Sequence, residues 1–196
     1  MKNRAQTNLF KIAIVAISLI GGVSCTEAKK PENDKVLADE HNNAKFDNTS
    51  KEKDSQFLVD AAEINLVEIQ LGQLANQNSN MTDVKELGKM MEKEHSQSLV
   101  ELTALAGKKK ITIPTSISDE AKDTYDKLIK KTNADFNTDY CEMMVKGHKD
   151  AISLFEKASI ECTDSEIKQW AVATLPALKT HLAYAVACQK KSEKIK

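Results

Sequence analysis

The stretch Thr82–Gly107, TDVKELGKMMEKEHSQSLVELTALAG, decides the fold that this sequence predicts. Its apolar residues recur at steps of three and four, which places them on one face of a long α-helix. Thr82 is the expected N-cap, and Gly107 with the three lysines after it marks the expected C-terminal end. The residues on this face are Val84, Leu87, Gly88, Met91, His95, Leu99, Leu102 and Ala106. His95 therefore lies in the middle of an apolar stripe.

Three further stretches show the same period and predict three more long helices. We expect these helices over residues 55–77, 136–159 and 165–190, the last capped by Thr163 or Asp164. The connection over residues 108–135 contains a weaker amphipathic helix over 119–132, capped by Ser118, and it is long enough to travel the length of a bundle. With only 3 prolines, 6 glycines and 5% aromatic residues, the composition favours helices. The sequence therefore predicts an all-α four-helix bundle with a crossover connection that contains a short extra helix.

The first 24 residues have the composition of an export signal. Lys2, Arg4 and Lys11 form a basic region, Ile12–Ile20 is a mostly apolar run, and small residues precede Cys25. Nine residues are too few to span a hydrocarbon core of ~30 Å. A cysteine at this position is typical of bacterial lipoproteins, the alternative being an ordinary secretory signal. We expect a signal peptide over residues 1–24, lipidation of Cys25, and an exported protein held in the periplasm or at the outer membrane.

Residues 25–54 are polar and aperiodic, and they predict a flexible tether that leads to the helical domain over residues 55–192. His41 lies in this tether, away from the apolar stripes. The only arginine, Arg4, belongs to the signal, and the formal net charge is −1. A mature chain that is acidic, without arginine and poor in aromatic residues lacks the means to bind nucleic acid. The expected partners are a membrane, through the lipid anchor, and an unknown protein.

Each long helix carries one ionisable residue near the middle of its apolar stripe. A polar group left unpaired in a dry core costs about 1–3 kcal/mol, so we expect the four side chains to meet. They can form a buried hydrogen-bonded network, or they can bind one transition-metal ion such as Fe, Cu, Zn or Mn. A lone buried histidine is usually a satisfied core residue. The four residues are Glu68, His95, His148 and His181.

The register of the last two long helices follows from the turn between them. Reflection through Glu161 puts His148 opposite Thr174. Antiparallel pairing brings Cys141, near the start of one helix, and Cys188, near the end of the other, to the same end of the pair, although this register leaves them several residues apart. A disulfide between these two cysteines is therefore one expectation.

Four residues near the cluster are weaker candidates for accessory roles. Glu92 and His95 form the E-x-x-H spacing of di-iron bundles, but Leu178 stands where a second such pair would need Glu. Methionines at helical spacing are more often core residues than soft-metal ligands. The accessory candidates are Glu92, Tyr140, Met91 and Met144. Because no nucleophile with an adjacent base, phosphate-binding glycine loop or Cys-x-x-Cys occurs, we expect no catalytic residue and a binding protein rather than an enzyme.

Four strings of the sequence resemble domain of unknown function 4142, a family of bacterial envelope proteins regarded as ferritin-like. The most specific pieces are M-x-x-x-H ending in His95, D-Y followed by M-x-x-x-H ending in His148, and L-P-x-L-x-x-H ending in His181. The resemblance covers residues 55–190 and implies a ferritin-like four-helix bundle in an exported protein, without an assigned activity. The strings are FLVDAAEINLVEIQLGQLA, VKELGKMMEKEHSQSLVELTALA, ADFNTDYCEMMVKGHKDAISLFEKAS and IKQWAVATLPALKTHLAYA.

The sequence leaves three functional interpretations. The first is a lipid-anchored helical-bundle protein of the cell envelope that binds a transition metal at the Glu/His cluster. The second is an envelope lipoprotein without metal that has a structural or protein-interaction role. The third is an oxygen-activating di-iron protein, which requires Glu63, Glu92 and Glu142 to be buried.

Overall fold

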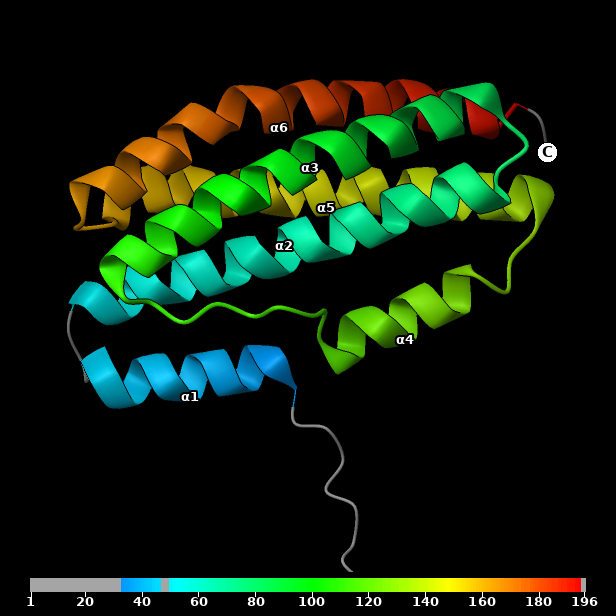
Figure 1. Ribbon diagram of the computed structural model, residues 1–196. Coiled ribbons are helices and arrows are strands. Elements are labelled where there is room, and N and C mark those ends of the chain that lie inside the picture. The colour runs from blue at the N-terminus through cyan, green and yellow to red at the C-terminus, as the bar shows by residue number, and fades with distance from the viewer. Residues whose placement is uncertain (1–32, 47–49, 195–196) are drawn as a thin grey trace, which may run out of the picture. The chain divides into compact units, whose positions relative to one another are not determined.

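The computed structural model describes residues 33–46 and 50–194 of the 196-residue chain. Within these ranges the chain forms six helices and no strand, as Figure 1 shows, which confirms the predicted all-α class. The expected signal peptide and Cys25 lie outside the described residues. The helices are α1 (Asp34–Phe46), α2 (Ser50–Asn78), α3 (Thr82–Lys109), α4 (Asp119–Leu128), α5 (Asn133–Glu161) and α6 (Ser165–Ser192).

Four long helices lie side by side as two antiparallel pairs, α2 with α3 and α5 with α6 (Figure 1). The pairs join through contacts of α2 with α5 and of α3 with α6. Because α3 and α5 run in the same direction, the chain between them must return along the length of the helices, and α4 lies in this return (Figure 1). The predicted crossover with its short helix is therefore confirmed. Ser118 caps α4 as expected, since its hydroxyl accepts a hydrogen bond from the backbone N–H of Ala121.

The helix ends differ from the predictions in detail. Met81, not Thr82, occupies the N-cap position of α3, and no side chain caps this end. The predicted stop at Gly107 was wrong, because α3 continues to Lys109 and ends where Lys110 adopts a left-handed conformation with φ of 59°. At α6 the expected cap Asp164 is confirmed: its carboxylate accepts the backbone N–H groups of Glu166 and Ile167.

Helix α1 occupies part of the segment predicted to be a flexible tether. Its Ala38 and Asn42 are buried, and the Asn42 side chain both donates to the carbonyl and accepts from the N–H of Thr112. Lys35 of α1 also forms an ion pair with Asp60 of α2 at 2.6 Å. Within the segment 25–54 predicted to be a flexible tether, the chain is therefore helical over residues 34–46 and again over 50–54, where α2 begins. Helix α1 escaped the prediction because a small residue and an amide dock it without an apolar stripe.

The core consists of two apolar clusters. One, here called the thiol half, contains Phe136, Cys141 and Cys188 and lies toward the α2–α3 turn. The other, called the aromatic half, contains Phe57 and Phe155 and lies toward the α5–α6 turn. Along each long helix the two halves are separated by buried polar residues, which together are called the histidine layer. The histidine layer consists of Asn65, Glu68, His95, His148 and His181.

Helix α6 is long and apolar enough to cross a membrane by length and composition, with a window of mean hydropathy 1.2. It nevertheless packs along α5 and α3. Its inward stripe carries Leu178, His181 and Cys188, all buried, whereas Lys179 points to solvent. A buried stripe with a solvated opposite face is typical of a core helix in a helical domain.

Candidate metal centre

His95 lies on the inward face of α3, one turn after Met91. Its Nδ1 is 2.9 Å from Oδ1 of Asn65 on α2. The amide nitrogen of Asn65 donates to the carbonyl of Ala61, so Oδ1 is the end of the amide that faces the ring as an acceptor. Nδ1 of His95 therefore carries the proton, and Nε2 keeps a free lone pair.

His148 follows Met144 by one turn on the buried face of α5. Its Nδ1 is 2.8 Å from the backbone carbonyl oxygen of Met144. A carbonyl can only accept, so Nδ1 donates and Nε2 carries the lone pair. The local helix geometry thus sets the tautomer of this ring.

His181 lies on the buried stripe of α6, and its hydrogen bond uses the other ring nitrogen. Nε2 of His181 is 2.7 Å from a carboxylate oxygen of Glu94 on α3. The carboxylate accepts, so Nε2 is the protonated nitrogen and Nδ1 has the lone pair. Glu94 itself reaches solvent, with 45% of its side chain exposed.

The three rings converge at one place between α3, α5 and α6. Their centroids form a nearly regular triangle with sides of 5.2, 5.3 and 5.6 Å. One ring nitrogen from each residue lies within 4.8 Å of the other two. Nε2 of His95, Nε2 of His148 and Nδ1 of His181 are buried and have no hydrogen-bond partner among the described residues. The structure therefore gathers three outwardly anchored imidazoles, each with an unused lone pair.

Burial keeps two of these rings neutral at neutral pH. Burial, together with the two neighbouring histidines, holds the pKa of His95 well below its ordinary value of 6.5. Burial also lowers the pKa of His148, to about 4, although its hydrogen bond to Met144 acts in the opposite direction. Neutral imidazole is the form that ligates a metal ion.

Glu68 is buried beside this group but does not belong to the convergent trio. Its Oε1 is 3.7 Å from Nδ1 of His148, so the carboxyl faces this ring from the side opposite the free Nε2. A Cβ at position 147 would come within 3.2 Å of the same oxygen, and Gly147 thus leaves space for the carboxyl. Burial raises the pKa of Glu68 to about 8. The four predicted residues therefore arrange as three histidines plus a carboxyl behind one of them.

The accessory candidates lie around the centre without joining it. Met91 and Met144 are buried in the thiol half as core residues. Tyr140 is also buried there, and burial raises its pKa well above the usual range. The Glu92 carboxylate accepts hydrogen bonds from the amides of Gln73 and Asn76 near the surface.

The carboxylates required by a di-iron centre are elsewhere. Glu63 accepts a hydrogen bond from the backbone N–H of Ser118, and Glu142 is exposed. Glu92 is held by the two amides just described. Within the described ranges, the grouped metal-ligating side chains are histidines alone.

Sequence reasoning missed two residues that orient the rings, Asn65 and Glu94. Asn65 lies on the buried face of α2, one turn before Glu68, so it carried the same signal of a polar side chain in an apolar stripe. Glu94 gave no such signal, because it is adjacent to His95 in sequence and points away from the stripe of α3. Only the position of α6 beside α3 reveals its role.

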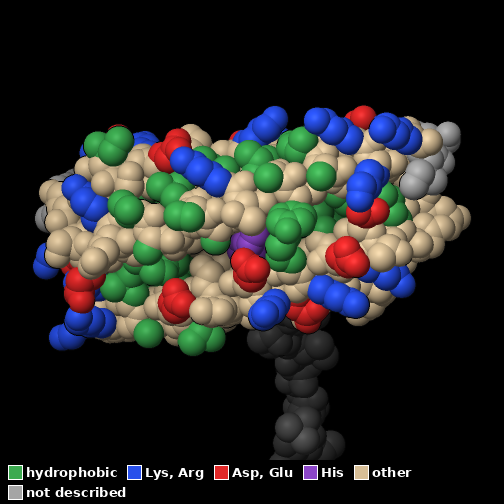
Figure 2. Space-filling model, turned by 90° about the horizontal axis from the view of Figure 1, so that it is seen from above, with side chains coloured by type: hydrophobic (Ala, Val, Ile, Leu, Met, Phe, Trp, Pro, Cys, Tyr) green, Lys and Arg blue, Asp and Glu red, His purple; other side chains and the backbone are tan. Residues whose placement is uncertain are grey.

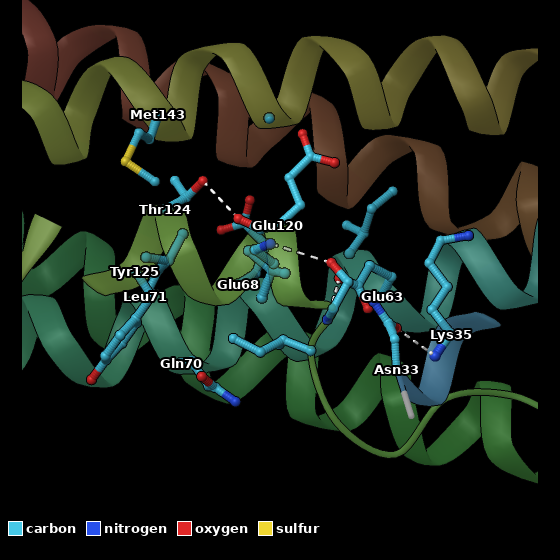
Figure 3. Close-up of a pocket in the computed structure, with 16 residues that line it drawn as sticks. Asn33, Lys35, Glu63, Glu68, Gln70, Leu71, Glu120, Thr124, Tyr125 and Met143 are labelled. Atoms are coloured by element: carbon cyan, nitrogen blue, oxygen red, sulfur yellow. Dashed lines mark hydrogen bonds between the residues drawn. The ribbon is translucent and has the colours of Figure 1, made fainter. Parts of the chain in front are cut away.

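Two cavities flank the histidine layer. One of about 380 Å³ opens between α3 and α6 and is lined by His95, His181 and Glu94. Figure 2 shows a histidine side chain at the bottom of a hollow on this face, next to an acidic side chain. The other, of about 500 Å³, lies on the side of Glu68 and is walled by α2, α4 and α5. In Figure 3, Lys35 lies at one end of it and Met143 at the other. The centre is thus reached from solvent through the first cavity.

No curated protein and no solved structure matches the chain. The family model described as domain of unknown function (DUF4142) matches residues 39–188, which contain the whole histidine layer. The match also covers the four long helices almost completely. Because it extends over more than half of the sequence, and in agreement with the resemblance noted from the sequence, this chain belongs to the DUF4142 family.

Proposed function

We propose that this protein binds one divalent transition-metal ion through Nε2 of His95, Nε2 of His148 and Nδ1 of His181. One observation carries the proposal: each of the three clustered rings keeps one buried nitrogen without a partner in the described part of the chain, while the opposite nitrogen of each ring already donates to an oxygen. The scaffold is a ferritin-like four-helix bundle. We also propose that it is exported and anchored in the cell envelope through a lipid on Cys25.

The hydrogen bonds favour a metal over a self-contained polar network. In such a network the buried groups would satisfy one another, because each unpaired group costs about 1–3 kcal/mol. Here each ring bonds outward to its own acceptor and leaves its inward nitrogen free. Histidines that ligate metals typically donate their second N–H to a carboxylate, a carbonyl or another oxygen. Glu94, the Met144 carbonyl and Asn65 supply these acceptors.

The donor set indicates which ions fit. Imidazole suits Zn, Cu, Fe and Ni, whereas Mn prefers oxygen ligands, so Mn is the weakest of the four metals expected from the sequence. Nitrogens at 2.0–2.1 Å from a tetrahedral zinc ion lie about 3.4 Å apart, so the three rings, now within 4.8 Å, need only a small contraction. Three protein ligands leave a fourth position, which the cavity between α3 and α6 makes accessible to water or a small ligand.

The envelope location rests on the N-terminal pattern. A basic region, a short apolar run and small residues before Cys25 are together typical of a bacterial lipoprotein signal. A lipid on Cys25 would make a membrane the first partner of this protein. The chain after residue 24 is acidic and has no arginine, so it lacks the side chains that usually recognise nucleic acid.

Equilibrium dialysis of the metal-depleted full chain against Zn²⁺ tests the metal proposal. We expect about one zinc ion per chain for the wild type. The double variant His95→Ala/His181→Ala loses two of three ligands and should bind at least 100-fold more weakly while its helical circular dichroism persists. His41→Ala is the matched control, because His41 is exposed on α1 and its loss should leave binding unchanged.

A wild-type chain that unfolds cooperatively but retains neither Zn²⁺ nor Cu²⁺ would overturn the proposal. The interpretation as a metal-free interaction protein would then replace it. Zinc binding that survives in the double variant would equally contradict the assigned ligands.

A further inference from the structure

Two thiols face each other in the thiol half. Cys141 on α5 and Cys188 on α6 are both buried, and their Sγ atoms are 2.8 Å apart, with Cys141 donating to Cys188. Both are free thiols in this structure. A disulfide has an S–S length of about 2.05 Å, so the two sulfurs need to approach by only about 0.8 Å.

The thiol pair is in register with the metal centre. His148 follows Cys141 by seven residues on α5, and His181 precedes Cys188 by seven residues on α6. Seven residues are about two helical turns, and the two helices are antiparallel. The alignment that pairs the thiols is therefore the same alignment that brings the rings of His148 and His181 to 5.3 Å between centroids.

We propose that Cys141 and Cys188 form a disulfide that links α5 to α6 and holds His148 and His181 in the register of the metal centre. The cross-link itself stands on the thiol geometry alone. Its effect on metal affinity rests on the proposed function.

A small oxidant has a path to this pair. Cys188 lines a cavity of about 360 Å³ at the surface between α3 and α6, beside Lys191 and Asp83. The hydrogen bond from Cys141 lowers the pKa of the Cys188 thiol and raises that of Cys141. Cys188 is therefore the more nucleophilic of the two and also the one that meets the cavity.

A hydroperoxide can supply the oxidation. The Cys188 thiolate attacks the O–O bond of hydrogen peroxide, which gives a sulfenic acid and hydroxide, and the hydroxide becomes water when it takes a proton. The sulfur of Cys141 then attacks the sulfur of Cys188, the S–O bond breaks, and the departing oxygen leaves as water with the proton of Cys141. Two thiols have lost two electrons and two protons, and one peroxide has been reduced to two waters.

Peptide mapping of the full chain tests the cross-link. After reduction and then treatment with hydrogen peroxide, trypsin should release peptides 132–146 and 180–190 as one species, lighter by two hydrogens than their sum. Cys162, on peptide 158–168, is the internal control, since it is a buried cysteine in the aromatic half and should remain alkylatable. Separate, fully alkylatable peptides 132–146 and 180–190 after peroxide would overturn the proposal.

Zinc competition measurements test the effect on the metal centre. Oxidised wild type should bind Zn²⁺ at least threefold more tightly than Cys141→Ser/Cys188→Ser, which has neither the cross-link nor the two thiols of this pair. Cys162→Ser should bind like the wild type. Equal affinities of the oxidised wild type and the double variant would refute the link to the centre. If the cross-link forms but neither protein binds zinc, the proposed function fails while the disulfide stands.

Discussion

The histidine layer and the aromatic half each bring three rings together at almost the same spacing. In the aromatic half, Phe57, Phe155 and Trp170 have centroids 5.0 to 5.9 Å apart. In the histidine layer the corresponding distances are 5.2 to 5.6 Å. The two phenyl rings carry no polar atom, and the indole Nε1 of Trp170, although it too has no hydrogen-bond partner among the residues that the structure describes, is a donor without a lone pair for a metal. Each imidazole, in contrast, is fixed by a hydrogen bond at one nitrogen and keeps an unpaired lone pair at the other. The comparison indicates that packing explains the first cluster, whereas the second has three unpaired lone pairs that the proposed metal ion would bind.

The largest expected effect is a loss of stability on changing the aromatic half, without a loss of metal binding at the histidine layer. Phe155→Ala removes a buried ring that contacts Phe57 and Trp170, and it should lower the free energy of unfolding of the metal-free protein by about 3–5 kcal/mol. Because Phe155 binds no metal, zinc stoichiometry below the unfolding transition should stay at one per chain. Phe155→Leu, which conserves much of the volume, is the control and should cost less than about 1.5 kcal/mol.

Chemical denaturation followed by circular dichroism, with and without Zn²⁺, measures both quantities. A folded Phe155→Ala chain that no longer binds zinc would show that the two regions are not separable.

The second largest effect is on how the free energy of unfolding depends on pH. The pKa of Glu68 is raised to about 8 from an ordinary 4.5, so the folded state holds a proton that the unfolded state releases. The stability that Glu68 contributes is therefore full below pH 4.5 and declines as the pH rises through 8. His148 acts oppositely, since its pKa falls from 6.5 to about 4: its contribution is full above pH 6.5 and declines as the pH falls toward 4.

Glu68→Gln should abolish the alkaline decline. Between pH 5 and pH 8.5, in the presence of a chelator, the wild type should lose about 2–4 kcal/mol more of its unfolding free energy than this variant does. Glu142→Gln, at an exposed position of α5, should follow the wild type. Parallel profiles for Glu68→Gln and the wild type would show that Glu68 is ionised in the folded protein throughout this range.

The smallest effect tests the outward hydrogen bonds of the rings. Glu94→Gln keeps an acceptor for Nε2 of His181 but removes the charge, and it should weaken Zn²⁺ binding by about 10- to 100-fold. Glu101→Gln is the matched control, because Glu101 lines the same cavity on α3 and belongs to none of the histidine hydrogen bonds described above. Equal zinc affinities of Glu94→Gln and Glu101→Gln, measured by competition with a chelator, would show that Glu94 does not contribute to metal binding.

Helical periodicity predicted the long helices and the inward positions of His95, His148 and His181, because side-chain direction follows from spacing along a single helix. What periodicity could not supply is the register between helices. The expected pairing of His148 with Thr174 was wrong: the ring of His148 packs against that of His181. The turn lies farther along the chain than Glu161, which is still the last residue of α5, and this shifts every partner on α6.

The same limit applies to the carboxylates. Glu68 was correctly expected inside, but its place behind His148 depends on how α2 meets α5, and Gly147 makes the space. Glu94 could not be predicted from its own helix, since its partner is on α6. The segment of α1 was missed because one buried alanine, the buried amide of Asn42 and the ion pair of Lys35 hold it in place, and not an apolar stripe.

The most direct test of the central claim is X-ray absorption spectroscopy at the zinc edge on the zinc-loaded full chain. We predict three imidazole nitrogens at about 2.0 Å and one further nitrogen or oxygen from water or a small ligand. Loss of the imidazole signal in His95→Ala/His181→Ala, with His41→Ala unchanged, would assign the ligands. A zinc ion coordinated by sulfur, or by oxygen atoms without imidazole, would contradict the account.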